Sequence, residues 1–222
     1  KGFTMKNNIL FFLFGLFITN VTNAAPIEIF NTGVDYSNNR LSIGSVDNHF
    51  TVLETASNAV KATRFVSGAN SWVAEGTDYG WIGLNASGAS TGSTYTFRTT
   101  FDLSNLDAST AVLEGFWAAD NFISGLLLNG SSTGETLFGG AGTPYRFGGN
   151  FSVTNGFIDG LNTLDFIVSD NGGKGGLLVD FTSASASVKQ IPPTPAPEPS
   201  ILALIGLGLT GLVFARRRSS QG

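Results

Sequence analysis

The chain has 222 residues, of which 42% are hydrophobic and only 13% are charged, and its formal net charge at pH 7 is −4. It contains no cysteine and one histidine, which excludes disulfide scaffolds, cysteine nucleophiles, thiolate metal sites and metal sites built from several histidines. The 29 glycines and 19 phenylalanines favour strands and turns and argue against an all-helical protein.

Residues 1–24 follow the layout of a secretory signal peptide. A basic residue, Lys6, precedes the apolar run 9–18, and small residues lead up to Ala24 and Ala25. We expect cleavage between Ala24 and Ala25. A buried core helix or a retained anchor is the alternative, but ten apolar residues are too few to span a bilayer, which needs about 20.

Residues 25–190 are long enough to form one domain with a sizeable core. They carry seven basic and fifteen acidic side chains, which gives this part of the chain a net charge of −8. Nucleic-acid binding depends on a basic patch that neutralises phosphates. We therefore expect no nucleic-acid partner.

Aromatic residues flank the polar loop 75–80. Trp72 and Trp81 stand on its two sides, and Tyr79 lies within it. Because sugar C–H faces bind aromatic surfaces as other apolar groups do, Trp72, Tyr79 and Trp81 are candidate glycan contacts. The alternative is that these rings pack in the core.

Residues 88–92 match the G-x-S-x-G spacing of a hydrolase nucleophile. That motif requires a strand before the serine and a helix after it, whereas polar loop residues flank this one. The single histidine, His49, also precedes the serine, which is the reverse of the hydrolase order. We interpret His49 as an ordinary exposed or hydrogen-bonded side chain.

Short strand patterns run through residues 25–190. The clearest is 94–101, where residues alternate with period two on β-branched and aromatic side chains. The segment 111–118 predicts another strand with Leu113 and Trp117 on its inward face. Weaker signals occur at 27–30, 50–53, 62–66, 71–74, 81–84, 145–147 and 151–154. Many short strands separated by Gly, Asn and Ser turns predict an all-β fold, an antiparallel jelly roll or β-sandwich.

The segments 163–168 and 177–181 predict a hairpin around a glycine-rich loop. A symmetric loop would place their apolar residues on one face and Asp165 directly opposite Asp180 on the other. Like charges that face each other at about 5 Å destabilise a sheet. A Ca²⁺ ion with further oxygen ligands would relieve the repulsion, so Asp165 and Asp180 are candidate metal ligands.

Other arrangements of this pair stay open. Lys174, Arg98 or Arg146 could neutralise the carboxylates, or a register shifted by two residues could separate them. The pair could also serve as the acid and base of a glycosidase, whose carboxyls lie about 5–9 Å apart. Nothing nearby in the sequence supplies the apolar pocket that raises the pKa of a general acid, so we predict a non-catalytic protein.

The last part of the chain divides into a linker and an apolar tail. Residues 191–199 form a proline-rich, extended linker that ends in Pro197, Glu198 and Pro199. Residues 200–222 contain an apolar segment and then a basic cluster made of Arg216, Arg217 and Arg218. We predict one C-terminal transmembrane helix that spans only marginally, with the arginines on the cytoplasmic side.

The order of these elements, Pro-Glu-Pro, then an apolar stretch, then arginines, resembles the PEP-CTERM sorting signal. The resemblance covers about the last 26 residues. It implies transient tethering in the inner membrane of a Gram-negative, exopolysaccharide-producing bacterium and recognition by an exosortase after export by the secretion machinery. Removal of the tail and release to the cell surface or the extracellular matrix of a biofilm would follow. An ordinary single-pass anchor is the alternative.

The stretch 72–180 also resembles a galactose-binding-like jelly roll of secreted bacterial proteins. The resemblance rests on the motifs at 81–83, 95–103, 117–121, 128–130, 160–168 and 176–179. Proteins with that fold include carbohydrate-binding modules, accessory domains of enzymes and domains without a known ligand. We therefore expect a secreted, surface-sorted, non-catalytic protein that associates with extracellular polysaccharide. The alternatives are a polysaccharide-degrading enzyme and a structural matrix protein without a specific ligand.

Overall fold

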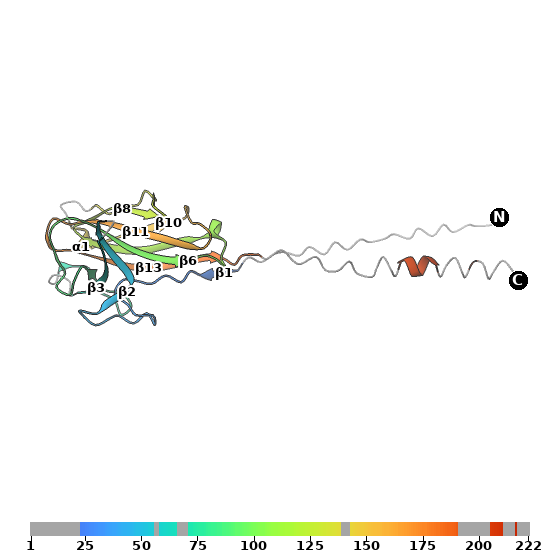
Figure 1. Ribbon diagram of the computed structural model, residues 1–222, viewed down its shortest axis with the longest axis horizontal. Helices are drawn as coiled ribbons and strands as arrows, with labels where there is room; N and C mark the ends of the chain where they lie inside the picture. The colour runs from blue at the N-terminus through green and yellow to red at the C-terminus, as the bar shows by residue number, and fades with distance from the viewer. Residues whose placement is uncertain are drawn as a thin grey trace, which may run out of the picture. The chain divides into compact units, whose positions relative to one another are not determined.

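A computed structural model of the protein describes residues 23–55, 58–65, 71–138, 143–190, 205–210 and 216. The chain divides into two units, Lys1–Val188 and Lys189–Gly222. The regular elements in the described part of the first unit are antiparallel strands, apart from two short helical turns (Figure 1). The predicted all-β class is thus confirmed for this unit.

The strands of this unit differ widely in length. In chain order, they are β1 (Ala24–Pro26), β2 (Val46–Thr55), β3 (Asn58–Arg64), β4 (Ile82–Gly83), β5 (Ala89–Ser90), β6 (Thr94–Asp102), β7 (Val112–Asp120), β8 (Phe122–Leu128), β9 (Ser131–Ser132), β10 (Gly149–Val153), β11 (Leu161–Ser169), β12 (Gly173–Lys174) and β13 (Gly176–Ser187). Two short helical turns, η2 (Ala108–Thr110) and α1 (Pro144–Phe147), interrupt them.

The main sheet folds into two layers that face each other. Its strand order is β10-β7-β13-β4-β3-β2-β6-β11-β8-β9, with β1 added on β13. Strands far apart in this order meet through their side chains: the ring of Phe166 on β11 lies 6.1 Å from that of Trp117 on β7 and 6.2 Å from that of Phe151 on β10. The layer β10-β7-β13 therefore covers the layer β2-β6-β11-β8, as in a β-sandwich.

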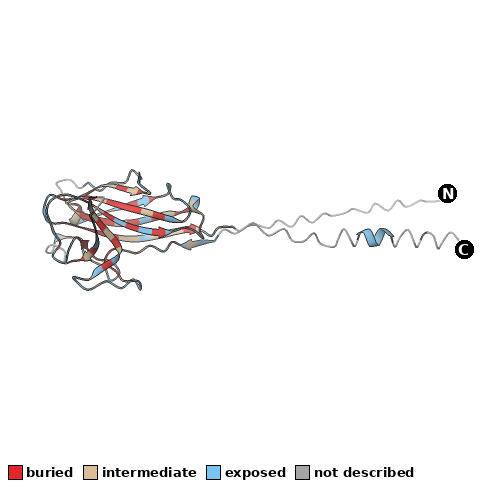
Figure 2. Ribbon diagram, viewed as in Figure 1, coloured by how far each residue is buried: buried red, intermediate tan, exposed pale blue. Residues whose placement is uncertain are grey.

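The core lies between these layers and follows the period-two pattern of the sequence. On β6, Tyr95, Phe97, Thr99 and Phe101 are buried, and the residues between them face outward. Figure 2 shows buried positions along the strands of both layers. Trp117 is also buried, as its place on the inward face of the predicted strand required. The alternation thus leaves the outer face of β6 free to build a site.

The predicted hairpin between 163–168 and 177–181 is wrong. β11 pairs with β6 and β8, whereas β13 pairs with β7, β4 and β1. The glycine-rich connection carries the chain from one layer to the other, and Gly172 and Gly173 adopt the positive φ values that this path requires. Both segments point their apolar residues into the same core, one from each layer. Their sequences therefore show the same alternation of apolar and polar residues that a hairpin would show.

The two ends of the chain are described only in part. Ala24 and Ala25, the predicted cleavage site, lie on β1 opposite Ser187 and Ala186 of β13. Residues 1–22 of the predicted signal peptide lie outside the described residues, as do Pro197, Glu198, Pro199, Arg217 and Arg218.

Of the predicted transmembrane segment 200–222, residues 205–210 and Arg216 are described, and all of them are helical. In the described ranges, no helix has the length and apolar character needed to cross a bilayer.

Candidate functional site

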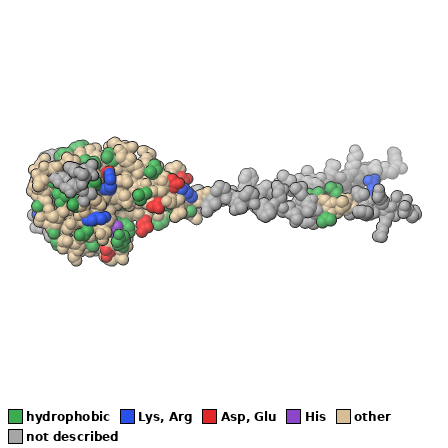
Figure 3. All heavy atoms as spheres, viewed as in Figure 1, with side chains coloured by type: hydrophobic (Ala, Val, Ile, Leu, Met, Phe, Trp, Pro, Cys, Tyr) green, Lys and Arg blue, Asp and Glu red, His purple; other side chains and the backbone are tan. Residues whose placement is uncertain are grey.

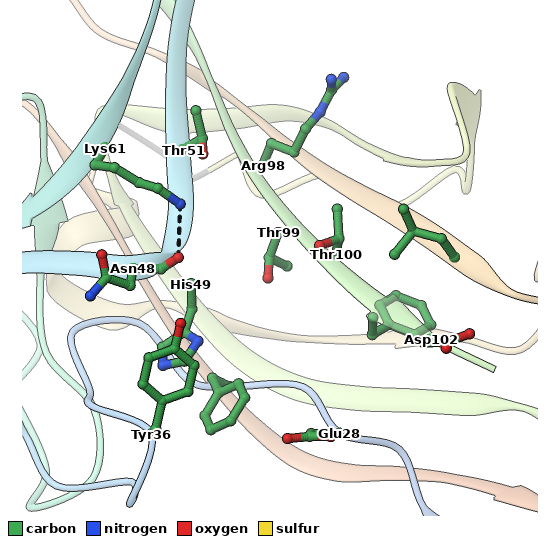
Figure 4. Close-up of a pocket in the computed structure, with 13 residues that line it drawn as sticks. Glu28, Tyr36, Asn48, His49, Thr51, Lys61, Arg98, Thr99, Thr100 and Asp102 are labelled. Carbon is green, nitrogen blue, oxygen red and sulfur yellow. Dashed lines mark hydrogen bonds between the residues drawn. The ribbon is translucent and has the colours of Figure 1, made fainter. Parts of the chain in front are cut away.

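A groove with a volume of about 420 Å³ lies on the outer face of β2 and β6 (Figure 4). The outward residues of the two strands form its floor, and the segment that follows β1 forms one wall. It is lined by Glu28, Phe30, Tyr36, Asn48, His49, Thr51, Lys61, Arg98, Thr99, Thr100, Phe101, Asp102 and Leu161.

Three aromatic rings form the wall of the groove. The imidazole of His49 stacks on Phe30 with 3.8 Å between ring centroids and 12° between ring planes. Tyr36 meets His49 edge to face at 4.5 Å, and Tyr36 itself is 72% exposed. The wall therefore offers an exposed aromatic ring on a fixed base of two stacked rings.

A local turn holds Tyr36 in place. The carboxylate of Asp35 accepts hydrogen bonds from the backbone N–H groups of Ser37 and Asn39, at 2.8 and 2.9 Å. Asn38 adopts a φ of 59°, which asparagine tolerates better than most residues. These bonds lower the pKa of Asp35, so the carboxylate that organises the turn stays ionised at neutral pH.

The imidazole of His49 is partly buried, which favours its neutral form. Burial is the main cause that lowers its pKa below the ordinary value, and a hydrogen bond to the backbone of Asp35 opposes this shift. Its Nε2 atom is buried and has no hydrogen-bond partner among the described residues. The sequence interpretation of His49 as an ordinary side chain missed its place in the aromatic wall.

The cations of the groove are engaged within the protein. Arg98 donates two hydrogen bonds to Asp165, Nε to Oδ1 and Nη2 to Oδ2, each 2.7 Å long. Lys61 Nζ donates to the backbone oxygen of Asn48 at 2.8 Å (Figure 4). The bidentate pair matches the planar geometry in which arginine binds carboxylates best.

The predicted aromatic site lies elsewhere, around the loop that follows β3. Trp72, Tyr79 and Trp81 do come together in one cluster, and the rings of Trp72 and Trp81 are 4.5 Å apart. Trp81 is fully buried, and its Nε1 donates to the backbone oxygen of Val73 at 3.0 Å. Core packing thus holds for Trp81, whereas Trp72 and Tyr79 are partly exposed and their glycan role stays a prediction.

A partly buried ion pair anchors this loop. Arg64 on β3 donates from Nη2 to Glu75 Oε2 at 2.6 Å, and the backbone N–H of Trp81 donates to Glu75 Oε1 at 2.8 Å. Arg40 adds a hydrogen bond to the backbone oxygen of Gly76. The loop that carries the cluster is therefore fixed from two sides.

The two predicted metal ligands lie in different layers. Asp165 on β11 is bound to Arg98, and Asp180 on β13 accepts a hydrogen bond from Asn31 Nδ2 at 3.1 Å. Burial, and then the negative charge of Asp78, raise the pKa of Asp180. Arg98 neutralises Asp165, as one of the sequence alternatives held. Among the described residues, no group of three or more His, Asp or Glu side chains suits a metal ion.

A second hollow of about 560 Å³ lies over β7 and β10. It is lined by Glu114, Gly115, Glu135, Asn150, Phe151, Ser152 and Thr182. Its one aromatic residue, Phe151, is buried in the core. The first groove is therefore the better candidate for binding a ligand with apolar faces.

Comparison with known proteins found one sorting motif and one solved structure of low similarity. Residues 195–218 match the PEP-CTERM protein-sorting motif. No curated protein matches the chain. Among solved structures, the CBM35 from Paenibacillus barcinonensis is similar with 15% identity and a TM-score of 0.34, over 62% of this chain and 95% of that one. The sorting motif implies an exported protein that an exosortase processes and that is anchored at the membrane before its release.

Proposed function

We propose that this exported protein binds extracellular polysaccharide without catalysis, and that the groove on β2 and β6 is its binding site. The observation that carries the proposal is the exposed ring of Tyr36 beside the stacked rings of His49 and Phe30. A sugar ring has an apolar C–H face that packs on such a ring and hydroxyl groups that need polar partners.

The floor of the groove supplies those polar partners. Thr51 on β2 and Thr100 on β6 contribute hydroxyl groups, and Asn48 contributes a side-chain amide. Thr100 stands on the outward face of β6, between buried neighbours that hold the strand in place. Ligand sites commonly combine apolar walls with a few polar groups in a space of roughly 300–1,000 Å³, and this groove has that composition and size.

The proposed location agrees with this ligand. A protein that an exosortase releases from the inner membrane of a Gram-negative bacterium would reach the cell surface or the extracellular matrix. The polysaccharide of that matrix is the partner that we propose.

The test is a binding measurement on the full chain, purified in a zwitterionic detergent without a sugar headgroup. The ligand is the matrix polysaccharide of the producing cells. We expect Tyr36→Ala to weaken binding by about fivefold or more, because a ring that stacks on a sugar contributes about 1 kcal/mol or more. Phe147→Ala is the matched control, since Phe147 is equally exposed but lies on α1, outside the groove.

Equal affinities of the wild type and Tyr36→Ala would contradict the proposed site. The same samples test the absence of catalysis through the release of reducing sugar. Release that disappears in Glu114→Gln or Glu135→Gln, the two carboxylates of the second hollow, would instead favour a polysaccharide-degrading enzyme.

A further inference from the structure

We infer that the groove accepts an uncharged polysaccharide and rejects chains of uronic acids or sulfated sugars. This inference rests on the proposed function, because it names the class of glycan that the same groove takes. It follows from the charges that line the groove and from what those charges already bind.

The two cations of the groove are poorly placed to recognise an anionic sugar. One edge of the Arg98 guanidinium is occupied by the two hydrogen bonds to Asp165, whose carboxylate is almost fully buried. A sugar carboxylate that bound to this edge of the guanidinium would displace Asp165. The Asp165 carboxylate would then be buried without its cation, which is unfavourable in free energy. Lys61 is held at the rim by its bond to the backbone of Asn48.

Two carboxylates oppose an anionic chain directly. Glu28 is exposed at the groove, and Asp102 ends β6 on the same side, away from Lys61 and Arg98 (Figure 4). The side chains of residues 25–190 carry a net charge of −8, and the face in Figure 3 shows few basic side chains, some of them near the histidine. A polyanion would therefore gain no long-range attraction and would meet local repulsion.

Neutral sugar hydroxyls fit the remaining groups. They can donate to the carboxylate of Glu28 and exchange hydrogen bonds with the hydroxyls of Thr51 and Thr100. Tyr36 can pack against an apolar sugar face without any charge. The groove thus offers acceptors, hydroxyls and a ring, which is the set that an uncharged glycan requires.

The experiment measures binding of the full chain, in the same detergent, to two panels at low and high salt. One panel contains neutral glucans, mannans and galactans, and the other contains alginate, polygalacturonate and a sulfated galactan. We expect at least one neutral polysaccharide to bind with an affinity that salt changes less than twofold, and the acidic panel to bind at least tenfold more weakly. Glu28→Lys should increase alginate binding severalfold, whereas Glu114→Lys, a matched exposed change outside the groove, should not.

The outcomes separate this inference from the proposed function. Binding of acidic polysaccharides alone, weakened by salt and by Tyr36→Ala, would overturn the inference and keep the groove as a glycan site. Binding to neither panel nor to the matrix polysaccharide would overturn both. Equal gains from Glu28→Lys and Glu114→Lys would show that net charge, and not the groove, controls selection, which also overturns the inference.

Discussion

Arg98 and Asp165 face each other across β6 and β11, joined by two hydrogen bonds of 2.7 Å. Only 6% of the Asp165 side chain is exposed, against 44% for Arg98. Burial therefore costs the carboxylate more solvation free energy than it costs the guanidinium. The interaction with the guanidinium offsets that loss.

We predict that Arg98→Ala lowers the free energy of unfolding by about 2 kcal/mol, because it leaves Asp165 buried without its cation. Urea denaturation at neutral pH measures this loss. The double variant Arg98→Ala/Asp165→Ala removes the stranded charge as well and should recover part of the stability. If the single and double variants unfold at the same urea concentration, the buried charge is not what destabilises Arg98→Ala.

The same pair leads to a prediction about metals. Asp165 Oδ1 and Oδ2 both accept from Arg98, and Asp180 lies in the opposite layer. We therefore expect neither Ca²⁺ nor EDTA to change the melting temperature of the protein. A thermal shift assay measures this. A rise with Ca²⁺ that Asp180→Asn abolishes would restore Asp180 as a metal ligand.

The sequence predicts the strands whose alternating pattern distinguishes a buried face from an exposed face. It does not predict which strands pair with each other. Alternation on β6 and β7 correctly places Phe97 and Trp117 in the core, because a strand with period two has one buried face. Alternation carries no information on which strand lies next to which. Phe166 and Val179 therefore read as neighbours in a hairpin, although they enter the core from opposite layers.

The groove was not predictable for a related reason. Its wall comes from Phe30 and Tyr36, and its floor from Thr51 and Thr100, on segments that only the strand order brings together. The alternating pattern of β6 identifies which of its residues face outward. The pattern does not show which loop lies against that outward face. Trp72, Tyr79 and Trp81 stand close in the sequence, so the sequence alone favours them as the aromatic site.

Trp81 and Trp72 should differ strongly in their effect on stability. Trp81 is fully buried and donates a hydrogen bond to Val73, so Trp81→Ala should lower the free energy of unfolding by about 4 kcal/mol. Trp72 packs on Trp81 and Tyr145 but is partly exposed, and Trp72→Ala should cost less than half as much. Chemical denaturation of both variants tests this, and equal losses would show that Trp72 is as much a core residue as Trp81.

Two carboxylates, the buried Asp47 and the partly buried Asp120, make stability depend on pH. Burial, as the largest cause, raises the pKa of Asp47 to about 6 and that of Asp120 to about 6, and the charge of Asp170 adds to the shift at Asp120. The native state then binds protons more tightly than the unfolded state, whose carboxyls titrate near 3.8. This contribution to stability is complete below the unfolded pKa and is lost as the pH rises through about 6. His49, with its lowered pKa, acts in the opposite direction.

Asp120→Asn tests this dependence, because it removes one titrating carboxylate. We expect the variant to be more stable than the wild type near neutral pH and similar to it near pH 4, so that its melting temperature changes less over that interval. Glu114→Gln, an exposed change on the same strand, should keep the dependence of the wild type. A larger stability gain at low pH than at neutral pH would contradict the raised pKa of Asp120.

The groove floor permits a test that leaves its shape unchanged. Thr100→Val replaces the hydroxyl on β6 with a methyl group of similar size, and valine is at least as favourable as threonine in a strand. We predict an unchanged melting temperature and a roughly fivefold to tenfold loss of affinity for the bound polysaccharide, the effect of one hydrogen bond worth about 1 kcal/mol. Thr94→Val is the matched control, since Thr94 lies on the same strand and the same outward face but outside the groove. If the two variants bind equally well, the Thr100 hydroxyl makes no hydrogen bond to the sugar.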